Sequence, residues 1–148
     1  MNEVRKSALV PFAAEDMFDL IEAAEDYPAF LPWCAGATVL ARDDSMVSAT
    51  IAVDFHGVRF KFDTRNSKRR PEFLAVQLVQ GPFRNFEGEW HLTQLSVRAC
   101  KIEFQLRYEF QSALMAKLAG PVFSNIANTL VDAFVGRAEK IHGAADRR

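Results

Sequence analysis

Apolar and polar residues alternate along the middle of the chain, from Gly36 to Phe110. The clearest stretch runs from Cys100 to Phe110, where every second residue is apolar and those between are mostly charged. Residues two apart lie on the same face of a strand, so this pattern predicts an antiparallel sheet with one apolar and one solvated face. The same alternation places further apolar positions at Ile51, Val53, Phe55, Val58, Phe60, Phe62, Leu74, Val76, Leu78, Phe86, Gly88, Trp90 and Leu92.

One further strand and two helices are predicted outside this region. Val4–Val10 is predicted to be a strand, and Ala13–Ala24 carries apolar residues at helical spacing. The aromatic and proline segment Tyr27–Trp33 follows, for which one short helical turn is expected. A long helix is predicted from about Ser112 to Ile141, with a kink or a restart at Pro121. Its apolar stripe consists of Leu118, Val122, Phe123, Ile126, Leu130, Phe134, Ala138 and Ile141.

These elements predict a single α+β domain over residues 1–148. A sheet of about seven strands is roughly 34 Å wide, whereas one helix is only about 10–12 Å across. The sheet must therefore curve around the C-terminal helix to cover its own apolar face. The space that remains is filled either by large side chains or by a ligand, and the pattern leaves both alternatives open.

The aromatic content bears on this choice. The chain has 148 residues, of which 49% are apolar and 25% charged, as in globular proteins, and 13 are Phe. Large rigid rings line apolar pockets as readily as they pack cores. The candidate ligand-facing residues are Phe55, Phe60, Phe62, Phe86, Trp90, Phe104 and Tyr108 on the sheet, opposite Phe123, Ile126 and Leu130 on the helix.

Charge and cysteine content exclude several classes of protein. The formal net charge is −1, which argues against binding DNA through an overall basic field. Cys34 and Cys100 are far apart and form no CxxC pair, so neither a zinc site nor a disulfide framework is expected. The chain begins without the apolar run of a secretory signal and lacks an uncharged apolar stretch of about 18 residues. We therefore expect a soluble cytoplasmic protein.

The sequence offers no catalytic constellation. His56, His91 and His142 are expected at a hairpin tip, on the outer sheet face and at a helix end. Cys34 and Cys100 have no predicted base to activate them, and motifs of hydrolases, zinc enzymes and phosphate-binding loops are absent. Since an apolar pocket without acid or base binds rather than reacts, we predict a binding protein with no metal and no cofactor.

Three sequence strings carry a resemblance to a known family. They are Tyr27–Cys34 (YPAFLPWC), Gly81–Trp90 (GPFRNFEGEW) and Gly120–Phe123 (GPVF), the last followed by Val131–Val135 (VDAFV). With these strings the chain resembles the ubiquinone-binding START-like family. That family includes coenzyme Q-binding proteins and the ribosome association toxins called RatA, and it belongs to the SRPBCC superfamily of helix-grip folds.

The resemblance implies a hydrophobic tunnel beneath the long helix that holds ubiquinone or a related polyisoprenoid lipid and so supports respiration. It places Phe83, Phe86 and Trp90 on the sheet, and places four residues near the opening: Tyr27, Phe30, Leu31 and Trp33. Of these, Phe30 and Trp33 are expected to guard the mouth. Polyketide cyclases of the superfamily offer an enzymatic alternative. A cyclase needs inward polar groups, and Tyr108 is the main one that the pattern predicts.

A basic run supports a second function. Arg65, Lys68, Arg69 and Arg70 lie around a predicted loop before Pro71. Such a run can contact RNA phosphates or anionic lipid headgroups, although most basic runs are only solvated loops. The resemblance to RatA makes the large ribosomal subunit a candidate partner, whose association with the small subunit would be blocked. Transient contact with the inner membrane surface is the corresponding hypothesis for a lipid carrier.

Overall fold

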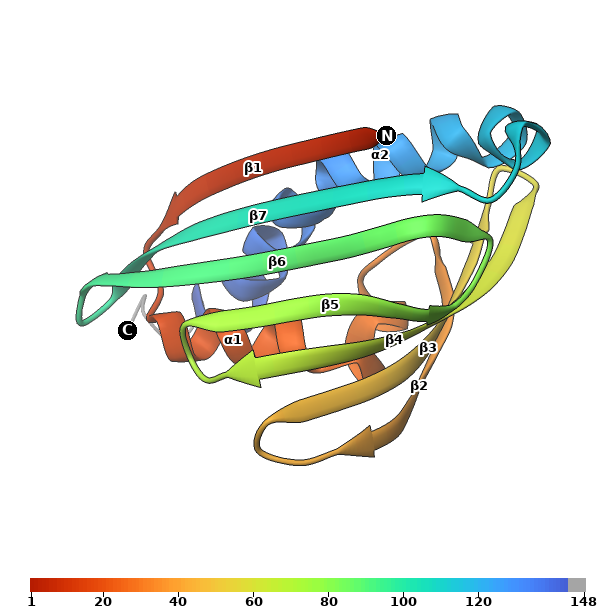
Figure 1. Cartoon of the computed structure of the whole chain (residues 1–148). Coiled ribbons are helices and arrows are strands. Elements are labelled where there is room, and N and C mark those ends of the chain that lie inside the picture. Colours follow the sequence, from red (N-terminus) through yellow and green to blue (C-terminus); the bar gives the residue numbers. More distant parts are fainter. Residues whose placement is uncertain (144–148) are drawn as a thin grey trace.

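The computed structural model describes residues 1–143, in which seven antiparallel strands curve around one long helix (Figure 1). The strands lie in the order β1-β7-β6-β5-β4-β3-β2, so consecutive strands from β2 to β7 are neighbours and β1 pairs with β7. The predicted helix-grip architecture, a curved antiparallel sheet around a C-terminal helix, is confirmed. The elements are β1 (Asn2–Val10), α1 (Ala14–Glu22), η1 (Ala24–Ala29), β2 (Cys34–Arg42), β3 (Met46–Phe55), β4 (Val58–Arg69), β5 (Phe73–Gln80), β6 (Phe83–Ser96), β7 (Ala99–Phe110), α2 (Ala113–Ala138) and η2 (Glu139–Gly143).

Strand β7 lies between β1 and β6, and its alternation is the one that the sequence predicts. Every even-numbered side chain from Cys100 to Phe110 is buried. Some opposite pairs on this face are aromatic: Trp90 lies across from Phe104, with ring centroids 4.3 Å apart. Cross-strand aromatic pairs of this kind stabilise the sheet and fix its register. The concave face is therefore the apolar one, and it faces the helices.

The segment after β1 differs in detail from the prediction. Helix α1 ends at Glu22, and the chain continues as the short 3₁₀ helix η1, which ends at Ala29 and so begins and ends earlier than expected. The amides of Phe30 and Leu31 both donate to the Tyr27 carbonyl, at 3.2 and 2.9 Å, and close this turn. As a result Tyr27 is held within η1 with its side chain against the core.

Helix α2 is continuous through Pro121, so of the two predicted alternatives, a kink or a restart, the restart does not occur. Ser112 is its N-cap and accepts a hydrogen bond from the Met115 amide at 3.1 Å. The predicted apolar stripe is wrong at both ends, because Leu118 is 59% exposed and Ile141 is 43% exposed. The first turns of α2 lie where β7 stops, at the end of the sheet (Figure 1), which leaves them little apolar surface to cover.

By length and composition alone, the helical segment Ala113–Gly143 could cross a membrane. Core helices of globular domains pass the same test. In this fold Phe123, Ile126 and Phe134 of that segment are buried in the core, so one face of the helix packs inside the domain.

Candidate functional site: an apolar cavity beneath the long helix

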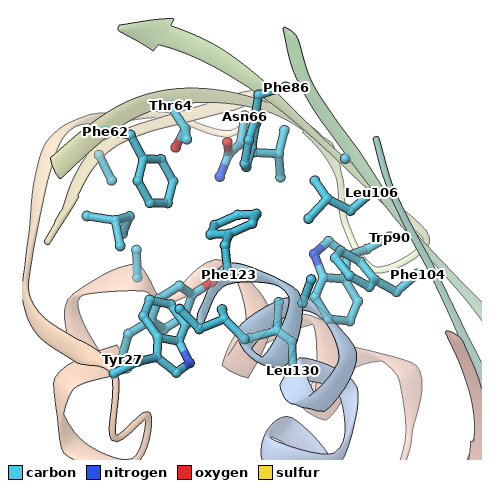
Figure 2. Close-up of a pocket in the computed structure, with 18 residues that line it drawn as sticks. Tyr27, Phe62, Thr64, Asn66, Phe86, Trp90, Phe104, Leu106, Phe123 and Leu130 are labelled. Carbon is cyan, nitrogen blue, oxygen red and sulfur yellow. The ribbon is translucent and has the colours of Figure 1, made fainter. Parts of the chain in front are cut away.

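A cavity of about 100 Å³ lies between the concave face of the sheet and α2 (Figure 2). Its walls come from η1, from strands β3 to β7 and from the middle of α2. Nine of the residues predicted to bind a ligand line it: Tyr27, Trp33, Phe62, Phe86, Trp90, Phe104, Phe123, Ile126 and Leu130.

Phe123 is the central side chain of this region. It projects from α2 toward the sheet (Figure 2) and is only 3% exposed. Its ring centroid lies 4.8 Å from that of Tyr108 and 5.1 Å from that of Phe83. Phe60 is also in this ring cluster, at 6.2 Å. These three predicted residues contact Phe123 but do not line the cavity, so Phe123 contacts both this ring cluster and the cavity.

The other predicted residues also lie outside the cavity walls. Leu31 is fully buried in the core, at 1% exposure. Phe55 packs beside His56 at the end of β3, with ring centroids 4.0 Å apart. Phe30 packs against the rings of Tyr27 and Phe134, while the guanidinium of Arg137 lies 5.2 Å above it.

The expectation that Trp33 and Phe30 guard the mouth is wrong in this conformation. Trp33 lines the cavity but is only 8% exposed, so it forms part of a buried wall. Phe30 is partly exposed but does not reach the cavity.

Two polar residues of the cavity wall are missing from the prediction. Thr64 and Asn66 lie on the concave face of β4, in the same phase as Phe60 and Phe62. Thr64 is 4% exposed, and the Oδ1 atom of Asn66 is buried without a hydrogen-bond partner. The prediction ended this strand near Asp63, although extending its alternation by two steps would have found both residues.

The two tyrosines of the region are neutral. The Tyr27 hydroxyl donates to the Ile21 carbonyl, and burial raises the pKa of Tyr27 well above its ordinary value. Burial also raises the pKa of Tyr108, while a hydrogen bond with Ser124 opposes that shift. Within the described chain, no residue lining the cavity has a charged side chain. The cavity is therefore suited to a neutral, largely apolar molecule.

The cysteines and histidines supply no reactive group to the cavity. Cys34 and Cys100 are buried free thiols, and desolvation raises the pKa of both, which disfavours the nucleophilic thiolate. His56 is exposed at the β3–β4 turn, His91 is exposed and lies 3.1 Å from Glu89, and His142 packs near Phe12. Over residues 1–143, no three His, Cys, Asp or Glu side chains gather closely enough to hold a metal ion.

The predicted basic run does not form one exposed loop. Strand β4 continues to Arg69, so side chains of the run alternate between the two faces of the sheet. Lys68 points toward α1, where its Nζ lies 2.8 Å from Glu22 Oε1. Arg70 binds the carboxylate of Asp19, also on α1, through two hydrogen bonds of 2.8 and 2.9 Å.

Only Arg65 and Arg69 of the run lie on the outer face. The guanidinium of Arg69 is 5.2 Å from the Phe73 ring centroid. Two of the four residues predicted to contact RNA or lipid headgroups, Lys68 and Arg70, therefore attach α1 to the sheet instead.

The two carboxylates that bind this run should differ in their importance for stability. Glu22→Gln should lower the free energy of unfolding by about 2–3 kcal/mol, because it removes the negative charge that faces the largely buried Lys68 and also Arg42. Lys68 and Glu22 are only 11% and 15% exposed. Asp19→Asn should cost about 0–1 kcal/mol, as for other surface pairs, since Asp19 and Arg70 are 57% and 51% exposed. Urea denaturation of both variants tests this, and equal losses would contradict it.

Comparisons with known proteins agree with this fold. Residues 10–135 match the family described as polyketide cyclase / dehydrase and lipid transport. The chain is 37% identical over 144 residues to "Ribosome association toxin RatA" of Escherichia coli K12, covering 97% of this chain and 91% of that protein.

A second relative and a solved structure extend the comparison. The chain is 28% identical over 145 residues to "Coenzyme Q-binding protein COQ10 homolog B, mitochondrial" of Xenopus laevis, covering 95% of this chain and 59% of that protein. The crystal structure of the Zhui aromatase/cyclase from Streptomyces sp. R1128 superposes with a TM-score of 0.82 at 14% identity, over 94% of each chain. That similarity concerns the fold alone.

Proposed function

Because this chain belongs to the polyketide cyclase / dehydrase and lipid transport family, we propose that it is a non-catalytic carrier of a hydrophobic ligand. The ligand that we propose is ubiquinone or a related polyisoprenoid lipid, in support of respiratory quinone function. The observation that carries this proposal is the cavity between the sheet and α2, whose walls are mostly aromatic and aliphatic and have no charged side chain. The name of the coenzyme Q-binding relative supports the choice of ligand.

The size of the cavity sets a condition on binding. Pockets that enclose drug-sized ligands measure roughly 300–1,000 Å³, whereas this one holds about 100 Å³. A quinone ring with an isoprenoid tail therefore requires the walls to move apart. Phe123 is the side chain whose displacement would add the most space, because it contacts both the cavity and the Phe60, Phe83 and Tyr108 cluster.

The same walls argue against the polyketide cyclase alternative. A cyclase must steer a reactive polyketide with acid, base or oxyanion-binding groups placed along its pocket. The polar residues that line this cavity, Tyr27, Thr64 and Asn66, are neutral, and one of them, Tyr27, already donates its proton to the Ile21 carbonyl. We therefore propose binding without turnover.

Organic extraction of the purified full-length chain, followed by mass spectrometry, tests the carrier function directly. We expect a neutral isoprenoid lipid in the extract, and we expect the delipidated protein to take up decylubiquinone. A protein that carries no lipid above the background of an unrelated protein and takes up no decylubiquinone would refute the proposal. The lipid recovered from cells would also identify the tail length.

Ribosome association is the second candidate function, and the 37% identity to RatA over nearly the whole chain favours it. Arg65 and Arg69 are the residues of the basic run whose side chains lie on the outer face of β4, where a partner would contact them. We further propose that the protein works in the cytoplasm, where it would reach either a ribosome or the inner membrane surface.

Sedimentation with ribosomes over a range of salt concentrations tests this second function. Binding through phosphates should weaken as salt rises, and the double substitution Arg65→Glu with Arg69→Glu should weaken it at every salt concentration. Arg5→Glu is the matched control, since Arg5 is an exposed arginine on β1. No sedimentation of wild-type protein at low salt, or equal loss in the control, would count against a ribosomal role for this surface.

A further inference from the structure

We propose that Thr64 and Asn66 form the polar end of the cavity and select ligands whose head is neutral and carries a hydroxyl group, such as a phenol or a quinol. This inference rests on the proposed carrier function and specifies which ligands it accepts. Both side chains lie on the concave face of β4 and line the cavity wall (Figure 2). Most of their neighbours there, including Phe62, Phe86 and Phe123, are apolar.

The hydrogen bonding of Asn66 indicates a missing partner. A carboxamide has two N–H donors and an acceptor oxygen, and buried polar atoms are nearly always paired because leaving one unpaired is costly. Asn66 Oδ1 is buried and unpaired in this structure. A head group that carries a hydroxyl can donate to this oxygen, and a carbonyl can accept from the amide nitrogen of the same side chain.

Thr64 strengthens the assignment because its hydroxyl can either donate or accept. The Thr64 side chain is polar and buried in the core, with only 4% of its surface exposed. Thr64 and Asn66 are two residues apart on one face of one strand. Together they offer hydrogen bonds to a single ligand oxygen or to two adjacent ones.

Because the cavity walls carry no charged side chain, the kinds of head group that can bind are limited further. A fatty acid carboxylate buried here would have no cation beside it, since none of the lining residues is Lys, Arg or His. Burial of an unpaired carboxylate is strongly unfavourable. The cavity should therefore discriminate against fatty acids and favour a neutral head attached to an apolar tail.

Binding of three probes tests this selectivity: 4-decylphenol, decylbenzene and decanoate. Wild-type protein should bind 4-decylphenol best and decanoate worst. Asn66→Leu should weaken 4-decylphenol binding about tenfold, which corresponds to about 1.4 kcal/mol, and should change decylbenzene binding less than about twofold. Thr64→Val should act in the same direction, and it guards against a folding defect in the first variant.

A stability measurement separates this role from a structural one. Because Asn66→Leu removes an unpaired buried oxygen, the ligand-free variant should melt at the wild-type temperature or above it. Equal losses for 4-decylphenol and decylbenzene, no loss for either, or a lower melting temperature in both variants would overturn the inference. If wild-type protein binds neither neutral probe, the carrier function itself fails and the inference falls with it.

Discussion

Phe123→Ala should lower the free energy of unfolding by about 3–5 kcal/mol, the range of buried Phe→Ala substitutions, and should increase the uptake of lipid. Phe123 is 3% exposed and packs within 6.2 Å of the rings of five other aromatic residues. Its removal joins the cavity to the space beside Phe60, Phe83 and Tyr108. The larger cavity should accommodate more of the ligand without further movement of the walls.

Chemical denaturation with and without decylubiquinone measures both effects. At a fixed concentration the ligand stabilises the folded state more when its Kd is lower, by about 2.7 kcal/mol at a hundredfold excess over Kd, so it should restore more stability to Phe123→Ala than it adds to wild type. Phe60→Ala is the control, since Phe60 contacts Phe123 without lining the cavity. Destabilisation of Phe123→Ala with unchanged or weaker ligand binding would show that Phe123 only packs the core.

Gly88→Val should have the opposite effect on the ligand, reducing its affinity at least about tenfold. Gly88 lies on the concave face of β6 between Phe86 and Trp90, and it lines the cavity. A Cβ atom placed there would meet Leu106 Cδ1 at 3.4 Å and Val76 Cβ at 3.7 Å, which are ordinary contacts. The added methyl groups would therefore occupy cavity space that a ligand needs.

The fold should tolerate this substitution. Burying the new carbon atoms contributes about 0.8 kcal/mol each, and a crowding cost of about 1–3 kcal/mol offsets that gain. We expect the free energy of unfolding to change by less than about 1 kcal/mol. Gly88→Ala is the matched control and should retain most of the ligand. Extracted-lipid quantitation and thermal melts check both variants, and a folded Gly88→Val protein with its full lipid content would place the ligand elsewhere.

The fold could be predicted from sequence because its signals are local and repeated. The alternation from Cys100 to Phe110 and the spacing from Phe123 to Ala138 each determine which side chains face inward. Phe62 and Trp90 are examples of predicted residues that do line the cavity. The phase of the alternation alone was enough to predict them. Exposure of Leu118 could not be predicted in this way, because it depends on where the sheet ends relative to the helix.

The errors around β4 have one cause. The run from Arg65 to Arg70 is so rich in charge that it resembled a loop, although Lys68 and Arg70 are bound by carboxylates of α1. Because the predicted strand ended too early, Thr64 and Asn66 were not predicted to line the cavity. An ion pair between distant elements leaves no periodic signal in the sequence, so only the structure could place these charges.

The uneven burial of α2 implies that its two halves open independently. In the turns before Pro121 only Ala119 is buried, whereas Phe123, Val131 and Phe134 are all buried after it. Pro121 also removes one backbone hydrogen bond between the halves. Local unfolding of the first half should therefore need far less free energy than global unfolding, and its amide protons should exchange with solvent sooner. The helix would then fray at the end of the sheet while its second half still anchors the domain.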